Sequence, residues 1–299
     1  MKMLTRPSIL AAAIVLYVAT AWSWGPEGHE IVARIAAANL NPTAAREIAN
    51  LLNVDTGQLP DAMAHAATWA DTIRPSHPET SGWHFVDIPR DQPNGKPSDF
   101  CPNNDCVSFR LADFVERLKN NTAGPGNFKR VDQLKFVLHF AGDIHQPLHD
   151  STNSDRGGNC VKVTNHSNDN LHHAWDTDLV SALGSDDTEV AATLTEKLAA
   201  MSASQRSSLT SGTPDDWAIA SHKLGISNAY GLLGSQVPLI KPQIEVKKSD
   251  CSDAPPKVRA MKVKLSASYL SKNEAVVEDQ LIKAGARLAA LLNSIWPAT

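Results

Sequence analysis

The chain has 299 residues, 42% of them hydrophobic and 20% charged, so it can bury a sizeable core and is not intrinsically disordered. Its formal net charge is −4, and beyond residue 23 it carries 26 basic and 32 acidic side chains. Such an acidic body excludes the common nucleic-acid-binding protein that holds phosphates with a broad surface of Lys and Arg. Any polyanion must therefore be held by something other than such a surface.

The first 23 residues have the pattern of a secretion signal. Residues 1–6 are short and basic, residues 9–21 form an apolar run, and Ala21-Trp22-Ser23 offers the small-x-small pattern of a cleavage site. A membrane anchor is the alternative, but it needs about 20 apolar residues. We therefore expect cleavage after Ser23, with Trp24 as the new N-terminus and a secreted or periplasmic location. No later segment is long and apolar enough to span a membrane.

Helical spacing of apolar residues recurs through most of the chain beyond residue 23. The residues that share a helix face are Ile31, Val32 and Ile35; Ile48, Leu51 and Leu52, after the start signal Asn41-Pro42-Thr43; Phe109, Ala112, Phe114 and Leu118; Leu134, Val137, Leu138 and Ala141; and, from about 273 to 296, Val276, Val277, Leu281, Ile282, Leu288, Leu291 and Leu292. Strand-like alternation is rare, with 83–88 the best short candidate. No repeat or linker divides the chain, so we expect one mainly α domain over residues 24–299.

Four cysteines can form two disulfides, which export would permit. Cys101 and Cys106 lie five residues apart in a loop rich in Pro, Asn and Asp. Cys160 and Cys251 remain, and their bond would close a loop of about 90 residues. Zinc ligation is the alternative, but no Cys-x-x-Cys pair occurs, so disulfides are favoured.

The densest group of ionisable residues is HFAGDIHQPLH, residues 139–149. On a helix, His139 and Asp143 lie one turn apart on the same face, where an imidazole and a carboxylate can converge on one ion. Pro147 disfavours helical geometry at the residue before it, so the chain turns and His149 can face a second ion. Apolar neighbours predict a buried helix, and buried ionisable groups need partners. Metal binding is therefore favoured over a solvated helix face.

Other candidate ligands are spread along the chain. His172 and Asp176 repeat the same spacing in LHHAWD, although His173 is an alternative that spacing alone does not exclude. His29, in WGPEGH, lies five residues from the predicted N-terminus, whose amine and carbonyl oxygen can chelate a metal. Asp71 in WADTIR and His84 in WHFVD complete the set, and each alone would be weak evidence.

Together these motifs resemble a known family. WGxxGH, WADxIR, WHFVD, HxxGDxHQPLH, GGN and LHxxWD follow one another between residues 24 and 180 as in the trinuclear-zinc, single-strand-preferring type I nucleases. The last third of the chain is similar only in helical character and length. The resemblance implies the compact all-helical fold of the zinc phospholipase C/nuclease superfamily, with long loops and at most a short hairpin.

The resemblance also implies three zinc ions per chain. The first would be held by Asp71, His84, His139 and Asp143; the second by the amine and carbonyl oxygen of Trp24, by His29 and by bridging Asp143; the third by His149, His172 and Asp176. Nitrogen and oxygen ligands independently suit catalytic zinc, whereas structural zinc more often uses Cys.

The implied activity is endonucleolytic hydrolysis of single-stranded DNA and RNA to products with 5′-phosphates. The resemblance allows a 3′-nucleotidase activity in addition. Besides the bridging ligand Asp143, the catalytic residues would be Arg74, which stabilises charge on the phosphate, and Asp87, which orients Arg74. Phe85 would help to form a base-binding pocket. The zinc ions would place positive charge in the cleft of an acidic protein.

Two alternatives belong to other functional classes. A zinc-dependent phospholipase C shares the fold, the N-terminal Trp and the zinc layout, but the surroundings of Arg74 and the WHF sequence favour the nuclease. A secreted zinc-stabilised binding protein is disfavoured by the open coordination positions. No membrane association and no obligate protein partner are expected. The segment 241–264, with scattered Lys residues, is a candidate substrate-side loop that nothing in the sequence requires.

Overall fold

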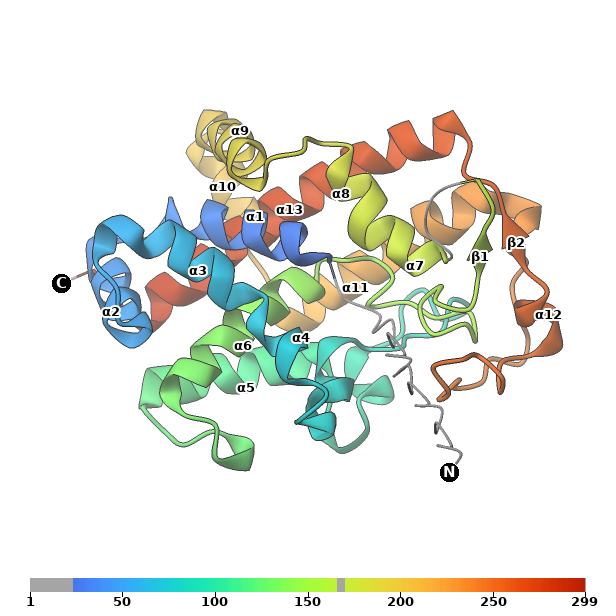
Figure 1. The fold of residues 1–299 in the computed structure, drawn as a ribbon, viewed down its shortest axis with the longest axis horizontal. Coiled ribbons are helices and arrows are strands. Elements are labelled where there is room, and N and C mark those ends of the chain that lie inside the picture. The colour runs from blue at the N-terminus through green and yellow to red at the C-terminus, as the bar shows by residue number, and fades with distance from the viewer. Residues whose placement is uncertain (1–23, 166–169, 299) are drawn as a thin grey trace, which may run out of the picture.

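The computed structural model describes residues 24–165 and 170–298, so the expected signal peptide, residues 1–23, lies outside the described residues. Within these ranges the chain folds into thirteen α-helices and one short parallel sheet (Figure 1). The helices are α1 (Pro26–Ala37), α2 (Pro42–Leu52), α3 (Leu59–Ala67), α4 (Trp69–Ile73), α5 (Val107–Asn120), α6 (Arg130–Asp143), α7 (Leu171–His173), α8 (Leu179–Ser181), α9 (Asp187–Ala200), α10 (Ala203–Thr210), α11 (Pro214–Leu224), α12 (Pro256–Arg259) and α13 (Ala267–Ile295). The strands are β1 (Lys162–Val163) and β2 (Lys262–Val263). The prediction of one mainly α domain is confirmed.

Helices α1 and α13 cross in the middle of the fold (Figure 1). Helix α1 packs against α13, α3 and α9, and its predicted apolar face, with Ile31, Val32 and Ile35, is buried. A Cβ added to Gly285 of α13 would lie 2.5 Å from Cβ of Ile35, so this close crossing requires glycine. Burial of the α1 face fixes residues 26–37 against the centre of the domain.

Local capping signals decide where helices start. The Asn41 side chain accepts a hydrogen bond of 2.9 Å from Ala44 N, so α2 begins where the sequence indicates. Helix α13 begins at Ala267, earlier than the expected start near residue 273. Ser266 Oγ caps it by accepting from Tyr269 N at 3.1 Å. Apolar spacing missed these first turns because they are rich in polar residues.

Residues 83–88, the best short strand candidate in the sequence, do not form a strand. The start of this segment belongs to a 3₁₀ turn, η2 (Pro78–His84), and none of the described residues 85–90 lies in a strand. Val86 N donates to His149 O at 2.8 Å, and an isolated β-bridge joins Pro89 to Thr152. The alternation therefore reflects one extended segment that lies along the loop after α6.

The C-terminal half of helix α6 and the loop after it are buried, and every residue from 136 to 155 is inaccessible to solvent or nearly so. The rings of Phe136 and Phe140 stack with centroids 5.3 Å apart, and Phe114 of α5 stacks on Phe136 at 4.9 Å. The His84 ring meets Phe140 edge-on at 5.2 Å. A packed aromatic layer thus supports the polar end of α6.

Two disulfides secure the long loops. Cys101 is bonded to Cys106 and Cys160 to Cys251, which are the pairs expected from the sequence. The second bond ties the chain just before β1 to the chain just before α12, 91 residues later. In the part of the chain that the structure describes, no helix combines the length and the apolar composition needed to cross a membrane.

Candidate metal centre

The C-terminal end of α6 brings an imidazole and a carboxylate together. Nε2 of His139 lies 3.2 Å from Oδ2 of Asp143, one turn later on the same helix. His84, at the end of η2, points Nδ1 at the same pair, 3.0 Å from His139 Nε2 and 3.1 Å from Asp143 Oδ2. All three side chains are buried, and their ligand atoms lie close enough together to hold one metal ion.

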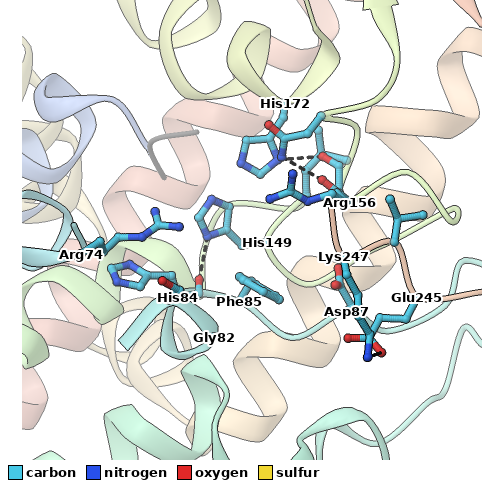
Figure 2. Close-up of a pocket in the computed structure, with 15 residues that line it drawn as sticks. Arg74, Gly82, His84, Phe85, Asp87, His149, Arg156, His172, Glu245 and Lys247 are labelled. Atoms are coloured by element: carbon cyan, nitrogen blue, oxygen red, sulfur yellow. Dashed lines mark hydrogen bonds and ion pairs between the residues drawn. The ribbon is translucent and has the colours of Figure 1, made fainter. Parts of the chain in front are cut away.

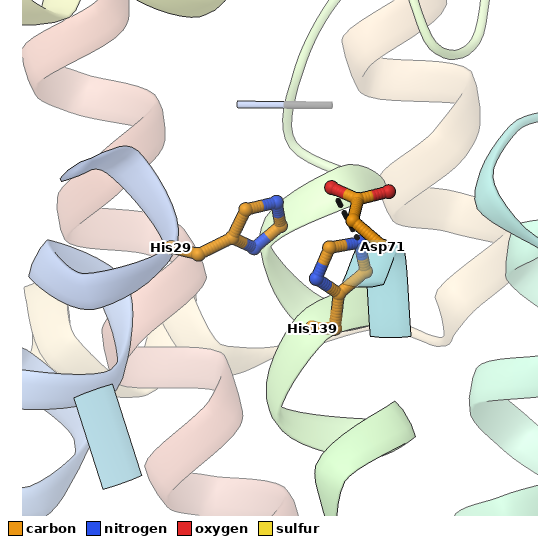
Figure 3. Close-up of side chains that lie close together, drawn as sticks. All are labelled: His29, Asp71 and His139. Atoms are coloured by element: carbon orange, nitrogen blue, oxygen red, sulfur yellow. Dashed lines mark ion pairs between the residues drawn. The ribbon is translucent and has the colours of Figure 1, made fainter. Parts of the chain in front are cut away.

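A second group shares His139 and adds side chains from α1 and α4 (Figure 3). The His29 ring of α1 stacks on His139 with centroids 3.9 Å apart, and its Nε2 lies 3.5 Å from Asp143 Oδ1. Asp71 of α4 places Oδ2 3.7 Å from His139 Nε2 and Oδ1 3.6 Å from His84 Nδ1. The two groups therefore form one continuous cluster of five side chains.

The third group consists of His149, His172 and Asp176. The chain turns after α6, and the His149 ring stacks on that of His172 with centroids 4.9 Å apart. His172 Nε2 lies 3.4 Å from Oδ2 of Asp176 across the junction of α7 with a π-helical turn, η6 (Ala174–Asp178). Such turns occur frequently at functional sites. His173 is less buried and lies outside the group. Of the two adjacent histidines, which spacing alone did not distinguish, it is therefore His172 that packs with His149 and Asp176.

Backbone carbonyls orient three of the clustered histidines, His139, His149 and His172. The Nδ1 atom donates in each case, which leaves the Nε2 lone pair for the cluster. The bonds are His139 Nδ1 to Ala67 O at 2.6 Å, His149 Nδ1 to His84 O at 2.8 Å, and His172 Nδ1 to Gly157 O at 2.7 Å.

The electrostatics of the centre call for cations. A neutral His139 presents its Nε2 lone pair to Asp143 Oδ2, and two such acceptors 3.2 Å apart repel unless a positive charge lies between them. Burial opposes a charged ring, yet Asp143 and Asp71 together raise the pKa of His139 to about 9. Burial raises the pKa of Asp176 well above its usual value. Among the described residues, no hydrogen bond reaches Asp143 Oδ1, Asp176 Oδ2 or His149 Nε2. This buried nitrogen and oxygen set fits divalent metal ions.

Trp24 connects the groups. It is fully buried, and its indole Nε1 donates to Gly142 O on α6 at 2.9 Å. The next residue, Gly25, donates its N–H to Asp176 O at 2.8 Å. The chain is thus fastened to α6 and to η6 at the residue where the sequence predicts the processed N-terminus.

A cavity of about 290 Å³ opens beside the centre (Figure 2). His84, His149 and His172 line its inner wall. Two of the three metal-binding groups therefore contact the cavity through a histidine, and the group of His29, Asp71 and His139 does not. Phe85 lines the cavity and is 37% exposed, so its ring is accessible from the cavity. A substrate in this cavity would meet the metal centre on one side and an aromatic face on another.

Arg74 is held by Asp71 and not by Asp87, the partner that the resemblance implied. Its Nη1 lies 3.2 Å from Asp71 Oδ1, because residues three apart on a helical turn share a face. Asp87 lies beyond Phe85, on the other side of the cavity from Arg74 (Figure 2). Burial, and then the charge of Asp155, raise the pKa of Asp87 to about 7. The structure therefore gives the orienting contact to Asp71.

Sequence reasoning missed several residues at the centre. Gln146 donates from Nε2 to Asp176 Oδ1 at 2.6 Å, and its place inside the 139–149 motif could have indicated such a role. Arg156 and Asn159 line the cavity, and nothing in the sequence singled them out. Residues 245–247 also line it, and they belong to the segment 241–264 that the sequence offered only as a candidate substrate-side loop. The disulfide to Cys160 was the available hint that the late segment lies here.

Comparisons with known proteins agree with this geometry. The model of the S1/P1 Nuclease family matches residues 24–297. Nuclease S1 of Aspergillus oryzae is 30% identical over 299 aligned residues, which cover 96% of each chain. Endonuclease 2 of Arabidopsis thaliana is 27% identical over 305 aligned residues, covering 95% of this chain and 97% of the relative. Nuclease P1 of Penicillium citrinum is 31% identical over 160 aligned residues, covering 52% of this chain and 57% of the relative.

Proposed function

Because the chain belongs to the S1/P1 nuclease family, we propose that it is a zinc-dependent endonuclease that cleaves single-stranded DNA and RNA and leaves 5′-phosphates. Family membership itself makes the protein a nuclease, a hydrolase of phosphodiester bonds. The single observation that supports the finer proposal is the set of three buried His/Asp groups beside one open cavity.

The proposed cofactor is three zinc ions per chain. Their ligands would be Asp71, His84, His139 and Asp143 for the first; the amine and carbonyl oxygen of Trp24, His29 and shared Asp143 for the second; and His149, His172 and Asp176 for the third. When bound, such ions lower the pKa of water and stabilise charge on phosphoryl and leaving oxygens.

The side chains of the cavity would position the phosphodiester. Arg74, braced by Asp71, would stabilise negative charge on the non-bridging oxygens. Gln146 would hold Asp176 in its orientation through the bond to Oδ1. No side chain of the cavity is needed to protonate the departing 3′ oxygen, and we assign none.

Phe85 and Asp87 would receive a nucleobase. A base can stack on the exposed Phe85 ring, with about 1–3 kcal/mol for such a contact, and its edge can bond to the carboxyl of Asp87. A base within a duplex is not free to enter such a pocket, so single strands are the expected substrates. A 3′-mononucleotide would fit the same arrangement, so we also expect 3′-nucleotidase activity.

We further propose that the protein matures by loss of residues 1–23 and acts outside the cytoplasm. Cleavage would free the α-amine of Trp24 at the junction between α6 and η6. The two disulfides support an oxidising compartment.

The decisive assay offers the mature, zinc-loaded protein a single-stranded DNA, a single-stranded RNA, a matching duplex and phosphatidylcholine. We expect cleavage of both single strands to fragments with 5′-phosphates, slower cleavage of the duplex and no release of phosphocholine. Inertness toward both single strands would refute the proposal. Release of phosphocholine would revive the phospholipase C alternative, which the comparisons do not favour.

A further inference from the structure

The overall acidity of the protein conceals one strongly basic segment. Residues 241–264, which we call the basic segment, carry seven basic and three acidic side chains. The rest of the chain beyond residue 23 carries 19 basic and 29 acidic ones. Positive charge is therefore concentrated in about a tenth of the molecule, and a local surface can bind a polyanion even where the net charge cannot.

The basic segment adjoins the cavity of the metal centre. Residues 245–247 line the cavity, and the chain then runs through Cys251 into α12 and β2. In the turn that leads into β1, Asn159 lines the cavity, and Lys162, the first residue of β1, follows three residues later. Three residues span at most about 10 Å. Figure 1 shows β1, β2 and α12 together at one end of the molecule, so the cavity wall continues into this basic surface.

Four cations of this surface, on α12 and around β2, are exposed and have no counter-charge among the described residues. Lys257, Arg259, Lys262 and Lys264 are all exposed, and none forms an ion pair with any residue in the described ranges. Other surface cations do have partners, such as Lys197, whose Nζ lies 2.6 Å from Glu278 Oε1. Like charges gathered without counter-charges repel one another, and a bound polyanion would relieve that repulsion.

The small sheet aligns three of the lysines. Lys162 of β1 pairs with Lys262 of β2 in a parallel register. Lys262 and Lys264 are exposed, whereas Val263 between them is buried, so both lysines project from the same face. Two residues along a strand span about 6.6 Å. Successive phosphates of an extended single strand are separated by a comparable distance.

We infer that a single-stranded polynucleotide bound at the cavity continues across β2 and α12, where Lys262, Lys264, Lys257 and Arg259 hold the phosphates that flank the cleaved one. This inference rests on the proposed nuclease function. The continuity with the cavity favours a substrate strand as the occupant over an unrelated anionic surface. These contacts would set affinity for long chains and leave the chemistry at the metal centre unchanged.

The test compares two double variants on two substrates. We call the four proposed phosphate-binding cations, Lys257, Arg259, Lys262 and Lys264, the track. The track variant, Lys262→Gln/Lys264→Gln, removes two of them. The control variant, Lys119→Gln/Lys129→Gln, removes two exposed cations near the N-terminal end of α6. This helix is about 20 Å long, and the metal-binding residues lie at its other end. The substrates are a 30-nucleotide single-stranded DNA and a dinucleoside monophosphate, which has no phosphate other than the cleaved one. KM and kcat are measured at several salt concentrations.

For the track variant we expect KM for the 30-mer to rise about tenfold at low salt, with the slope of log KM against log salt reduced by about 1.4. The dinucleoside monophosphate should be cleaved with wild-type constants, and the control variant should match the wild type on both substrates. If the track and control variants share the same KM and salt slope on the 30-mer, the track does not exist. If the wild type cleaves neither substrate, the nuclease proposal itself fails.

Discussion

Replacement of Gly142 by Ala tests the packing that holds the second group of metal ligands. A Cβ at this position of α6 would lie 2.7 Å from Nδ1 and 3.0 Å from Cε1 of His29. On another side the His29 ring is stacked on His139, with centroids 3.9 Å apart. The added methyl group would press on the His29 ring, and the ring cannot move toward His139 because the two rings are already in contact. The His29 ring must therefore move away from its present position.

The size of the effect follows from these distances. Relief of the clash requires the His29 ring to move by roughly 0.7 Å, whereas metal–ligand distances in proteins are held within about 0.2 Å. The zinc proposed to bind His29 should therefore be lost or greatly weakened. A misplacement of about 1 Å near reacting groups can reduce the rate about 100-fold. Stability should change less, because Ala favours a helix over Gly by about 1 kcal/mol and so partly offsets overpacking.

The assay is elemental analysis of the purified mature variant together with its rate on single-stranded DNA. We expect two zinc ions per chain in place of three, and a fall in kcat/KM of about 100-fold. Gly57→Ala is the matched control, since a Cβ there has no atom within 4 Å. Three zinc ions and wild-type kcat/KM in the Gly142→Ala protein would show that the position of His29 is not set by this packing.

Three further predictions concern other parts of the centre. A variant that keeps extra residues before Trp24 should bind two zinc ions and lose most activity, because its α-amine is blocked; full activity with an intact extension would contradict the N-terminal ligand. Arg74→Lys should lower kcat more than it raises KM, since a single ammonium does not reproduce the guanidinium braced by Asp71; an unchanged kcat would remove Arg74 from the mechanism. The pKa of Asp87 is raised to about 7 in the folded protein, whereas an Asp in the unfolded chain titrates near 3.9. Between about pH 4 and pH 7 the folded state therefore binds more protons than the unfolded state, and Asp87 lowers the stability as the pH rises through this range. In urea unfolding, Asp87→Asn should therefore gain stability over the wild type at pH 8 and not at pH 4, and an equal difference at both pH values would be evidence against the raised pKa.

The sequence predicted the features that depend on local spacing. His139 and Asp143 face one another because helical periodicity alone places residues four apart on the same side. The turn at Pro147 likewise separates His149 from α6 and lets it join His172 and Asp176. Burial of α6 followed from the apolar residues that surround its polar ones.

Features that depend on distant contacts were not accessible in this way. His172 and His173 are adjacent, and what distinguishes them is the bond from His172 to a carbonyl fifteen residues earlier. The strands β1 and β2 have two residues each and pair across about a hundred positions, too short for any alternation to reveal them. The segment 245–247 reaches the cavity through tertiary packing and a disulfide, so its role could not be read from its own residues.

A metal count on the secreted protein, with its N-terminal residue identified, tests the proposed trinuclear centre most directly. The mature chain should begin at Trp24, contain three zinc ions, and lose nuclease activity as a chelator removes them. A fully active protein that contains no zinc, or that keeps its activity after the zinc is removed, would show that the buried His/Asp groups do not form the catalytic centre.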